Sequence, residues 1–138
     1  MDKSTTRAVY VLGIQLKTLP PHLKASYGSL DQIGVTVKED LERCARNGFP
    51  CKLRIIDPDD VDVSVSHFEA ELESGMSEFK AVMFGAGIRG HTDPVPFERA
   101  IAAARRVLRP DIPLLFNDGP AGHAAALERH FGVKFERS

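Results

Sequence analysis

A glycine-rich segment in the second half of the chain carries the residues with the clearest chemical potential. Arg89 can bind a carboxylate or phosphate through two parallel hydrogen bonds. His91 can accept or donate a proton near neutral pH. Gly85, Gly87 and Gly90 permit a tight turn and let backbone amides approach a bound anion. Together these residues predict a site in which the amides and Arg89 bind a small molecule and His91 moves a proton.

The same residues have structural interpretations, which stay open at this point. The glycines alone account for a tight turn with positive φ. Arg89 could be an exposed loop residue paired with Asp93 or Asp118, and His91 a surface histidine bonded to Asp93. The glycine spacing also matches the letters of a dinucleotide-binding turn, but that motif follows the first strand of its unit and this one follows the third. We therefore expect no nicotinamide or flavin cofactor.

Polar residues also follow other apolar runs of the chain. Gln15 follows the first run, Asp57 the second, and Asn117 with Asp118 the fourth. Each is a favoured turn or capping residue. If the runs are parallel strands, however, their carboxyl ends share one edge of the sheet, where open α/β sheets bind ligands. We therefore predict Asp57 as a further catalytic residue, and Gln15, Asn117 and Asp118 as ligand-binding residues.

The apolar runs alternate with helix-like patterns along the chain. The runs are short and continuous, as in strands buried on both faces. The helix candidates combine apolar residues at helical spacing with capping signals at their ends. Strands are expected at residues 8–12, 51–56, 81–84 and 112–116, with a short fifth strand at 133–136. Helices are expected to begin at the capping boxes Thr36–Glu39 and Ser66–Glu69, near Phe97 and at His123.

This alternation requires parallel strands joined by right-handed crossovers, with helices on both faces. We predict an α/β fold in one domain over residues 1–138. It would be a doubly wound three-layer sandwich, flavodoxin-like or Rossmann-like, with the sheet order 2-1-3-4. One connection, over residues 15–35, is long for a compact domain. We interpret it as a lid or an oligomer contact, with a brief helix over residues 21–26.

The composition excludes several classes of protein. The 138 residues carry a formal net charge of −1, without the basic excess typical of nucleic-acid binders. No apolar run is long enough to cross a bilayer, and the first residues lack the apolar core of a signal peptide. Cys44 and Cys51 lack the ligand spacing of a zinc site, so neither a metal nor another cofactor is expected. We interpret both as buried thiols of a cytoplasmic protein.

Two loops resemble those of the type II 3-dehydroquinate dehydratases. These are small flavodoxin-like lyases, in which a lid tyrosine takes a proton and a histidine of a Gly-x-x-x-His-Thr-like loop donates one. The resemblance implies that Tyr27 is the base and that His91, in the run from Gly87 to Thr92, is the acid. The chain departs from that family at Gly85, where an asparagine is expected, and in the lid, which has no arginine. The whole chain also resembles small Rossmann-like proteins of undefined function.

The sequence therefore favours a cofactor-independent enzyme acting on a small anionic or polar organic molecule. It would be a lyase, a hydrolase or an isomerase. His91 would move the proton, with Tyr27 or Asp57, and the amides of residues 87–90 would stabilise developing negative charge. The alternative is a non-catalytic module that binds a ligand or a partner protein through the same edge of the sheet. Both are compatible with a homo-oligomer.

Overall fold

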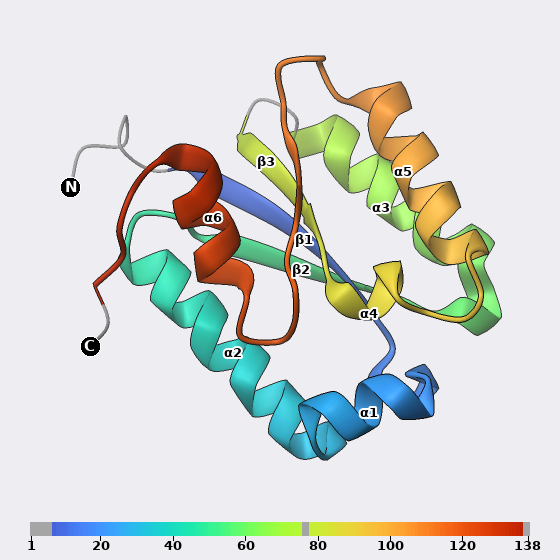
Figure 1. The fold of residues 1–138 in the computed structure, drawn as a ribbon. Coiled ribbons are helices and arrows are strands. Elements are labelled where there is room, and N and C mark those ends of the chain that lie inside the picture. Colours follow the sequence, from blue (N-terminus) through green and yellow to red (C-terminus); the bar gives the residue numbers. More distant parts are fainter. Residues whose placement is uncertain (1–6, 76–77, 137–138) are drawn as a thin grey trace.

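A computed structural model describes residues 7–75 and 78–136 of the chain. Its centre is a sheet of four parallel strands in the order β2-β1-β3-β4, with helices on both faces (Figure 1). The predicted α/β architecture and strand order are confirmed, and the fold is a flavodoxin-like three-layer sandwich. The strands are β1 (Ala8–Ile14), β2 (Cys51–Ile56), β3 (Phe79–Phe84) and β4 (Leu114–Phe116).

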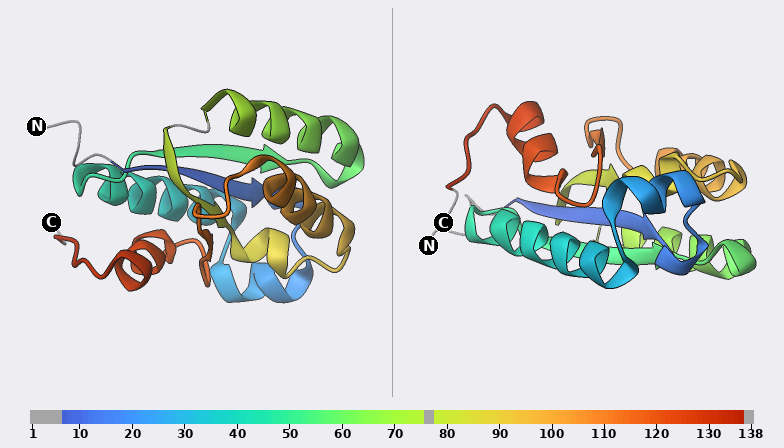
Figure 2. Two further views of the ribbon diagram at one scale, coloured as in Figure 1. Left: turned by 90° about the horizontal axis from the view of Figure 1, so that it is seen from above. Right: turned by 60° about the horizontal axis from the view of Figure 1, so that its bottom comes forward.

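The helices form one layer on each face of the sheet (Figure 2). α3 packs beside α5 on one face, and α2 packs beside α6 on the other. α1 and the short α4 lie at the carboxyl edge of the sheet, after β1 and β3 respectively. The helices are α1 (Pro21–Tyr27), α2 (Leu30–Arg46), α3 (Val61–Gly75), α4 (Ala86–Arg89), α5 (Val95–Val107) and α6 (His123–Phe131).

The central strand β1 is apolar on both faces because it is covered on both. Successive side chains of a strand point to opposite faces. Tyr10 and Leu12 belong to the core on the α3 side, together with Phe68, whereas Val9 belongs to the core on the other side, with Leu127 of α6. All of these side chains are buried. A strand in this position must be apolar throughout, so a continuous run predicts it well.

The segment between β1 and α2 is mostly helical, and its helical part is longer than the brief helix predicted over residues 21–26. Leu16–Thr18 forms a 3-10 turn, and the brief helix expected over residues 21–26 is present as α1. α2 begins at Leu30 instead of Thr36, because the Ser29 side chain accepts a hydrogen bond from an amide of the first turn, with a donor–acceptor distance of 3.1 Å. The role of this segment as a lid or an oligomer contact stays a prediction.

α3 also begins earlier than its capping box indicated. After β2 the chain forms a 3-10 turn over Pro58–Asp60, and the Asp57 carboxylate caps it by accepting a hydrogen bond from the Asp59 amide at 3.0 Å. α3 follows directly at Val61. The box that starts at Ser66 therefore lies inside the helix. In the same way, part of the glycine-rich segment after β3 is a helical turn, α4, where the sequence indicated a loop.

The expected fifth strand is absent from the part of the chain that the structure describes. Residues 133–136 pair with no strand. The Phe135 amide donates to the Glu128 carboxylate at 2.7 Å, and the Glu136 amide donates to the Asn47 side-chain oxygen at 3.0 Å. Side-chain oxygens thus accept the hydrogen bonds that these backbone amides would donate to a neighbouring strand in a β-sheet. The alternating pattern that suggested a strand includes the buried ring of Phe135.

A charged cluster lies on the face of the sheet that α3 covers. The buried Tyr10 hydroxyl and Arg54 Nε each donate to Glu71 Oε1 at 2.7 Å, and Lys52 Nζ lies 2.5 Å from the other carboxylate oxygen. Partial burial alone would raise the pKa of Glu71. The hydrogen bonds from Lys52, Tyr10 and Arg54 together outweigh that effect and hold this pKa at about 2. Burial and the Glu71 carboxylate raise the pKa of Tyr10.

We expect Glu71→Gln to lower the free energy of unfolding at neutral pH by about 2 kcal/mol, the size of a hydrogen bond to a charged group. Because the pKa of Glu71 is depressed in the folded state, the carboxylate stabilises the fold above its unfolded pKa. That contribution is lost as the pH falls through the folded-state pKa. Urea denaturation across the acid range should therefore show the difference between the two proteins shrinking. A constant difference would contradict the argument, and Glu73→Gln, at an exposed position of the same helix, is the control.

Candidate functional site

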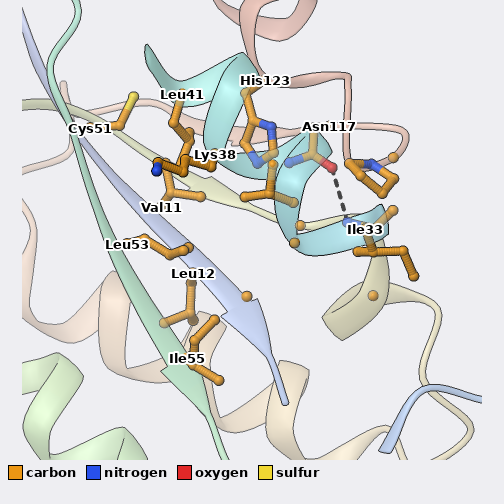
Figure 3. A pocket seen from close by; sticks show the side chains of 18 of the residues that line it. Val11, Leu12, Ile33, Lys38, Leu41, Cys51, Leu53, Ile55, Asn117 and His123 are labelled. Atoms are coloured by element: carbon orange, nitrogen blue, oxygen red, sulfur yellow. Dashed lines mark hydrogen bonds between the residues drawn. The ribbon is translucent and has the colours of Figure 1, made fainter. Parts of the chain in front are cut away.

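A cavity of about 510 Å³ lies between α2 and the sheet, beside β1 and β2 (Figure 3). Pockets that bind small molecules have volumes of roughly 300–1,000 Å³. The sheet side is formed by residues such as Val11 and Gly13 of β1 and Leu53 and Ile55 of β2. Leu53 and Ile55 are each 41% exposed, so the cavity opens at the β2 edge. The facing residues of α2 include Ile33, Gly34, Val37, Lys38 and Leu41.

One glycine of α2 helps to keep this space open. Gly34 lines the cavity on the side opposite the sheet. A Cβ atom at Gly34 would meet no atom within 4 Å, so α2 faces open space at that position. Glycine inside a helix costs about 1 kcal/mol relative to alanine. The chain therefore carries a residue that is unfavourable for its helix at a position where a larger side chain would enter the cavity.

At the inner end of the cavity, His123 pairs with a carboxylate of α2. Asp40 Oδ2 lies 3.0 Å from His123 Nδ1, and the two side chains are 6% and 5% exposed. Because an ionised carboxylate only accepts hydrogen bonds, Nδ1 carries the proton and donates it. In a neutral ring with this tautomer, Nε2 is the nitrogen without a proton. It forms no hydrogen bond with the residues that the structure describes.

The same carboxylate caps the start of α6. Gly122, the residue before this helix, has no side chain that could accept a hydrogen bond. A Cβ atom there would meet the exposed Asp118 carboxylate and lie 3.1 Å from the Asp118 nitrogen, so a larger residue would require both to shift. Asp40 supplies the missing acceptor, binding the amide of His123 at 2.7 Å and that of Ala124 at 3.3 Å. The position of His123 therefore depends on α2.

Asn117 follows β4 at the same end of the cavity and is 2% exposed (Figure 3). Its Oδ1 accepts a hydrogen bond from the Ala86 amide at 3.0 Å, which joins the ends of β3 and β4. Among the described residues, its Nδ2 meets only the Met83 sulfur, at 3.6 Å. Thioethers are weak acceptors, so this donor is available to a ligand. The inner end of the cavity thus combines an imidazole nitrogen and an amide donor.

Four of the residues predicted from the sequence line the cavity: Tyr27, Gly85, Gly87 and Asn117. The Tyr27 hydroxyl donates to the Asp118 carbonyl at 3.4 Å, so α1 contacts the loop after β4. The structure therefore brings together residues from three loops at the carboxyl edge of the sheet. The other predicted residues lie outside the lining: His91, Arg89, Gly90, Asp57, Gln15 and Asp118.

His91 and Arg89 connect the loops at this edge. His91 Nε2 lies 2.9 Å from the Thr18 carbonyl oxygen, and Nδ1 accepts a hydrogen bond from the Asp93 amide at 3.1 Å. Nε2 therefore carries the ring proton, and both ring nitrogens have protein partners. The Arg89 guanidinium donates to the Asn117 carbonyl at 2.5 Å. The catalytic role of His91 and the anion-binding role of Arg89 stay predictions.

The remaining candidates make local contacts. The Asp57 amide donates to Ser64 Oγ at 3.1 Å, so this residue lies on the α3 side of the edge. The Gln15 amide donates to the carbonyl at the end of β2 at 3.0 Å. Gly90 ends α4, and the Asp118 side chain is exposed. These contacts position the loops.

Asp40 is the residue that the sequence did not reveal, and His123, placed by the sequence at the start of a helix that could face the same cleft, was not predicted as a site residue. They are 83 residues apart, and neither follows a strand directly. One available signal is the spacing of Ile33, Val37, Asp40 and Cys44, which places a carboxylate within the apolar face of α2. A buried carboxylate needs several donors around it, and Arg43 of the same helix, 4.0 Å from Asp40 Oδ1, supplies only one of them. The glycine before α6 is the second signal, because it leaves that helix without a cap of its own.

Metal-binding groups and cysteines add little to this site. Within residues 7–75 and 78–136, no group of three or more His, Cys, Asp or Glu residues could hold a metal ion. Cys44 and Cys51 are free thiols; Cys44 is buried as expected, whereas Cys51 is partly exposed and lines the cavity. The neighbouring Cys51 thiol and burial raise the pKa of Cys44, which keeps it protonated.

Among the described helices, none is both long and apolar enough to cross a membrane.

Comparison with known protein families, curated proteins and solved structures finds no significant match. The resemblance to the type II 3-dehydroquinate dehydratases therefore stays a prediction. The fold and the cavity define the class of the protein. It is a flavodoxin-like α/β protein with a largely apolar cavity between α2 and the sheet, and with a buried Asp–His pair at the inner end of that cavity.

Proposed function

We propose that this protein is a cofactor-independent enzyme that transfers a proton on a small organic molecule bound between α2 and the sheet. The observation that carries the proposal is the buried Asp40–His123 pair. It leaves Nε2 of the ring without a partner among the described residues, in a side chain that lines the cavity. A general base must be unprotonated and held within reach of its substrate. A carboxylate on the other ring nitrogen fixes the required tautomer.

The proposed step is proton abstraction next to a carbonyl group. His123 Nε2 takes the proton, the C–H bond breaks, and its electron pair moves to the carbonyl oxygen as an enolate forms. Asp40 stabilises the resulting imidazolium, and Asn117 Nδ2 donates a hydrogen bond to the enolate oxygen. Return of the proton to a different carbon completes an isomerisation. Loss of a leaving group from the β carbon completes an elimination, so we favour an isomerase or a lyase.

A non-catalytic binding module is the alternative. The observation that favours it is the lining itself, which is largely apolar, with His123 and Asn117 as its buried polar residues. Such a lining is typical of a site that holds a ligand by burial of its surface. The experiment below separates the two functions, because a module would return its ligand unchanged.

Exchange of α-protons in D₂O, followed by NMR with 2-heptanone and phenylacetone as probes, tests the proposal. The wild-type protein should accelerate exchange over buffer. His123→Gln should lower that acceleration about 100-fold or more, because general bases contribute roughly 10²–10⁴-fold and glutamine cannot act as one. Glutamine at this position can still donate to Asp40 and should preserve the fold, which thermal unfolding checks.

His130→Gln is the matched control, since it makes the same change at an exposed histidine of the same helix, outside the cavity. This variant should keep its exchange rate within about twofold, because its ring does not line the cavity. Loss of exchange in His91→Gln with retention in His123→Gln would move the site to the edge loops and refute the proposal. Saturable binding of 2-heptanone without exchange would identify a binding module instead.

A further inference from the structure

The residues that line the cavity indicate which molecules fit it. The inference rests on the proposed function, because it concerns the same site. We propose that the substrate is an elongated, largely apolar carbonyl compound. Its polar end would lie at His123 and Asn117. Its apolar body would lie along β1 and β2, toward the β2 edge of the sheet.

The inner end of the cavity offers two polar atoms to a ligand. His123 and Asn117 are 4% and 2% exposed, and among the described residues Nε2 of His123 has no partner and Nδ2 of Asn117 has only a sulfur atom. A ligand with a polar end gains contacts there that an apolar end would not make. A carbonyl oxygen accepts from Asn117 Nδ2, and the carbon beside it carries the proton that Nε2 would take. The carbonyl end of the substrate therefore belongs inside.

The rest of the cavity favours an apolar chain. Val11, Val37 and Leu41 line its middle, and the half-exposed side chains of Leu53 and Ile55 line its opening. The one lysine or arginine among the described lining residues is Lys38, whose side chain is exposed. A multiply charged anion would therefore find no cation at the inner end, where burial of its charge is costly. The cavity therefore favours an uncharged carbonyl group at its inner end over the anionic group predicted from the sequence.

The size of the space also points to an occupant. The volume of about 510 Å³ equals the space of about 17 liquid water molecules at roughly 30 Å³ each. Protein interiors contain few voids larger than one water molecule. Because residue 34 is glycine, no side chain enters this space from that position of α2, although glycine lowers the stability of the helix. A bound apolar chain would fill the space and cover Leu53 and Ile55.

Calorimetric binding of 2-butanone, 2-heptanone and 2-decanone to the whole protein tests the inference. Each buried methylene should raise the affinity about fourfold until the cavity is full. Gly34→Leu should weaken 2-decanone binding about tenfold or more, because its side chain occupies the cavity, while leucine supports the helix better than glycine. Val35→Leu is the matched control at the next position, which is 51% exposed and outside the lining. Its affinity should equal that of the wild type.

Val37→Phe, which also narrows the cavity, provides a second filled variant if Gly34→Leu unfolds. An affinity that does not depend on chain length would overturn the inference, as would wild-type binding by a folded Gly34→Leu protein. His123→Gln should lose proton exchange and keep the chain-length dependence. Chain-length dependence without exchange in the wild type would refute the proposed function and support the inference. Exchange confined to 2-butanone would refute the inference and support the proposed function.

Discussion

Asp40→Ala is expected to lower the free energy of unfolding by about 3–5 kcal/mol, because each buried donor left without an acceptor costs roughly 1–3 kcal/mol. The substitution leaves three donors without an acceptor: the amides of His123 and Ala124, and His123 Nδ1. It also removes the cap of α6, which Gly122 cannot replace. Native domains are stable by only about 5–15 kcal/mol, so this is a large fraction of the total. Urea denaturation followed by circular dichroism measures it.

Glu39→Ala is the control for Asp40→Ala, because it removes an exposed carboxylate from the adjacent position of the same helix. Exposed substitutions of this kind usually change stability by less than about 0.5 kcal/mol. Asp40→Asn should lie between the two, since its amide oxygen can still accept from the start of α6 but carries no charge. Equal stability of Asp40→Ala and Glu39→Ala would show that neither the cap nor the ring contact contributes, and it would remove the structural basis of the site.

Burial explains why the strands could be predicted. Every strand of a covered parallel sheet has neighbours above and below, so apolar residues must be continuous, and β1 and β3 carry such runs. The edge strand β2 departs from this rule, with Lys52 and Arg54 on the α3 face. It was still identified, because its ends are marked by a glycine turn and by Asp57. The strand order was predicted as the flavodoxin-like one among those that the crossover rules permit, without any knowledge of side-chain contacts.

Helix starts were harder, because capping patterns are local and recur by chance. The Ser/Thr-x-x-Glu patterns that begin at Thr36 and Ser66 both match the sequence of a capping box, yet both lie inside helices. The caps in use are Ser29 and Asp57, each followed by acidic residues within the first turn. A pattern of four residues cannot distinguish the first turn of a helix from a later one, since that depends on where the apolar face meets the sheet.

The site was only partly predictable, because its key contact joins distant segments. Asn117 and Gly85 were identified from topology alone: both follow strands, and strand ends of a parallel sheet meet at one edge. Asp40 and His123 follow no strand and look like surface residues of two helices. Their pairing depends on α2 packing beside α6, which neither helix encodes by itself. The cavity was equally hidden, because it reflects side chains that are missing from α2 at Gly34.

Asn117→Leu is expected to slow α-proton exchange about 100-fold, since removal of one donor to a developing oxyanion costs roughly 10²–10³ in rate. It should also lower the free energy of unfolding by about 2 kcal/mol, because the Ala86 amide loses its acceptor at the junction of β3 and β4. The first effect depends on Nδ2, and the second on Oδ1. Exchange measured by NMR and urea denaturation of the same variant report on the two atoms separately.

Asp118→Ala is the matched control for Asn117→Leu, at the next residue, whose exposed side chain lies outside the cavity. The Tyr27 hydroxyl contacts only its backbone carbonyl, so that bond survives the substitution. Exchange should therefore remain at the wild-type rate. Unchanged exchange in a destabilised Asn117→Leu would make Asn117 a structural link between strands and leave His123 without an oxyanion donor. Asn117→Leu could instead slow exchange and keep the wild-type stability. In that case water in the cavity would accept the hydrogen bond from the Ala86 amide in place of Oδ1, whereas no group would donate to the substrate in place of Nδ2.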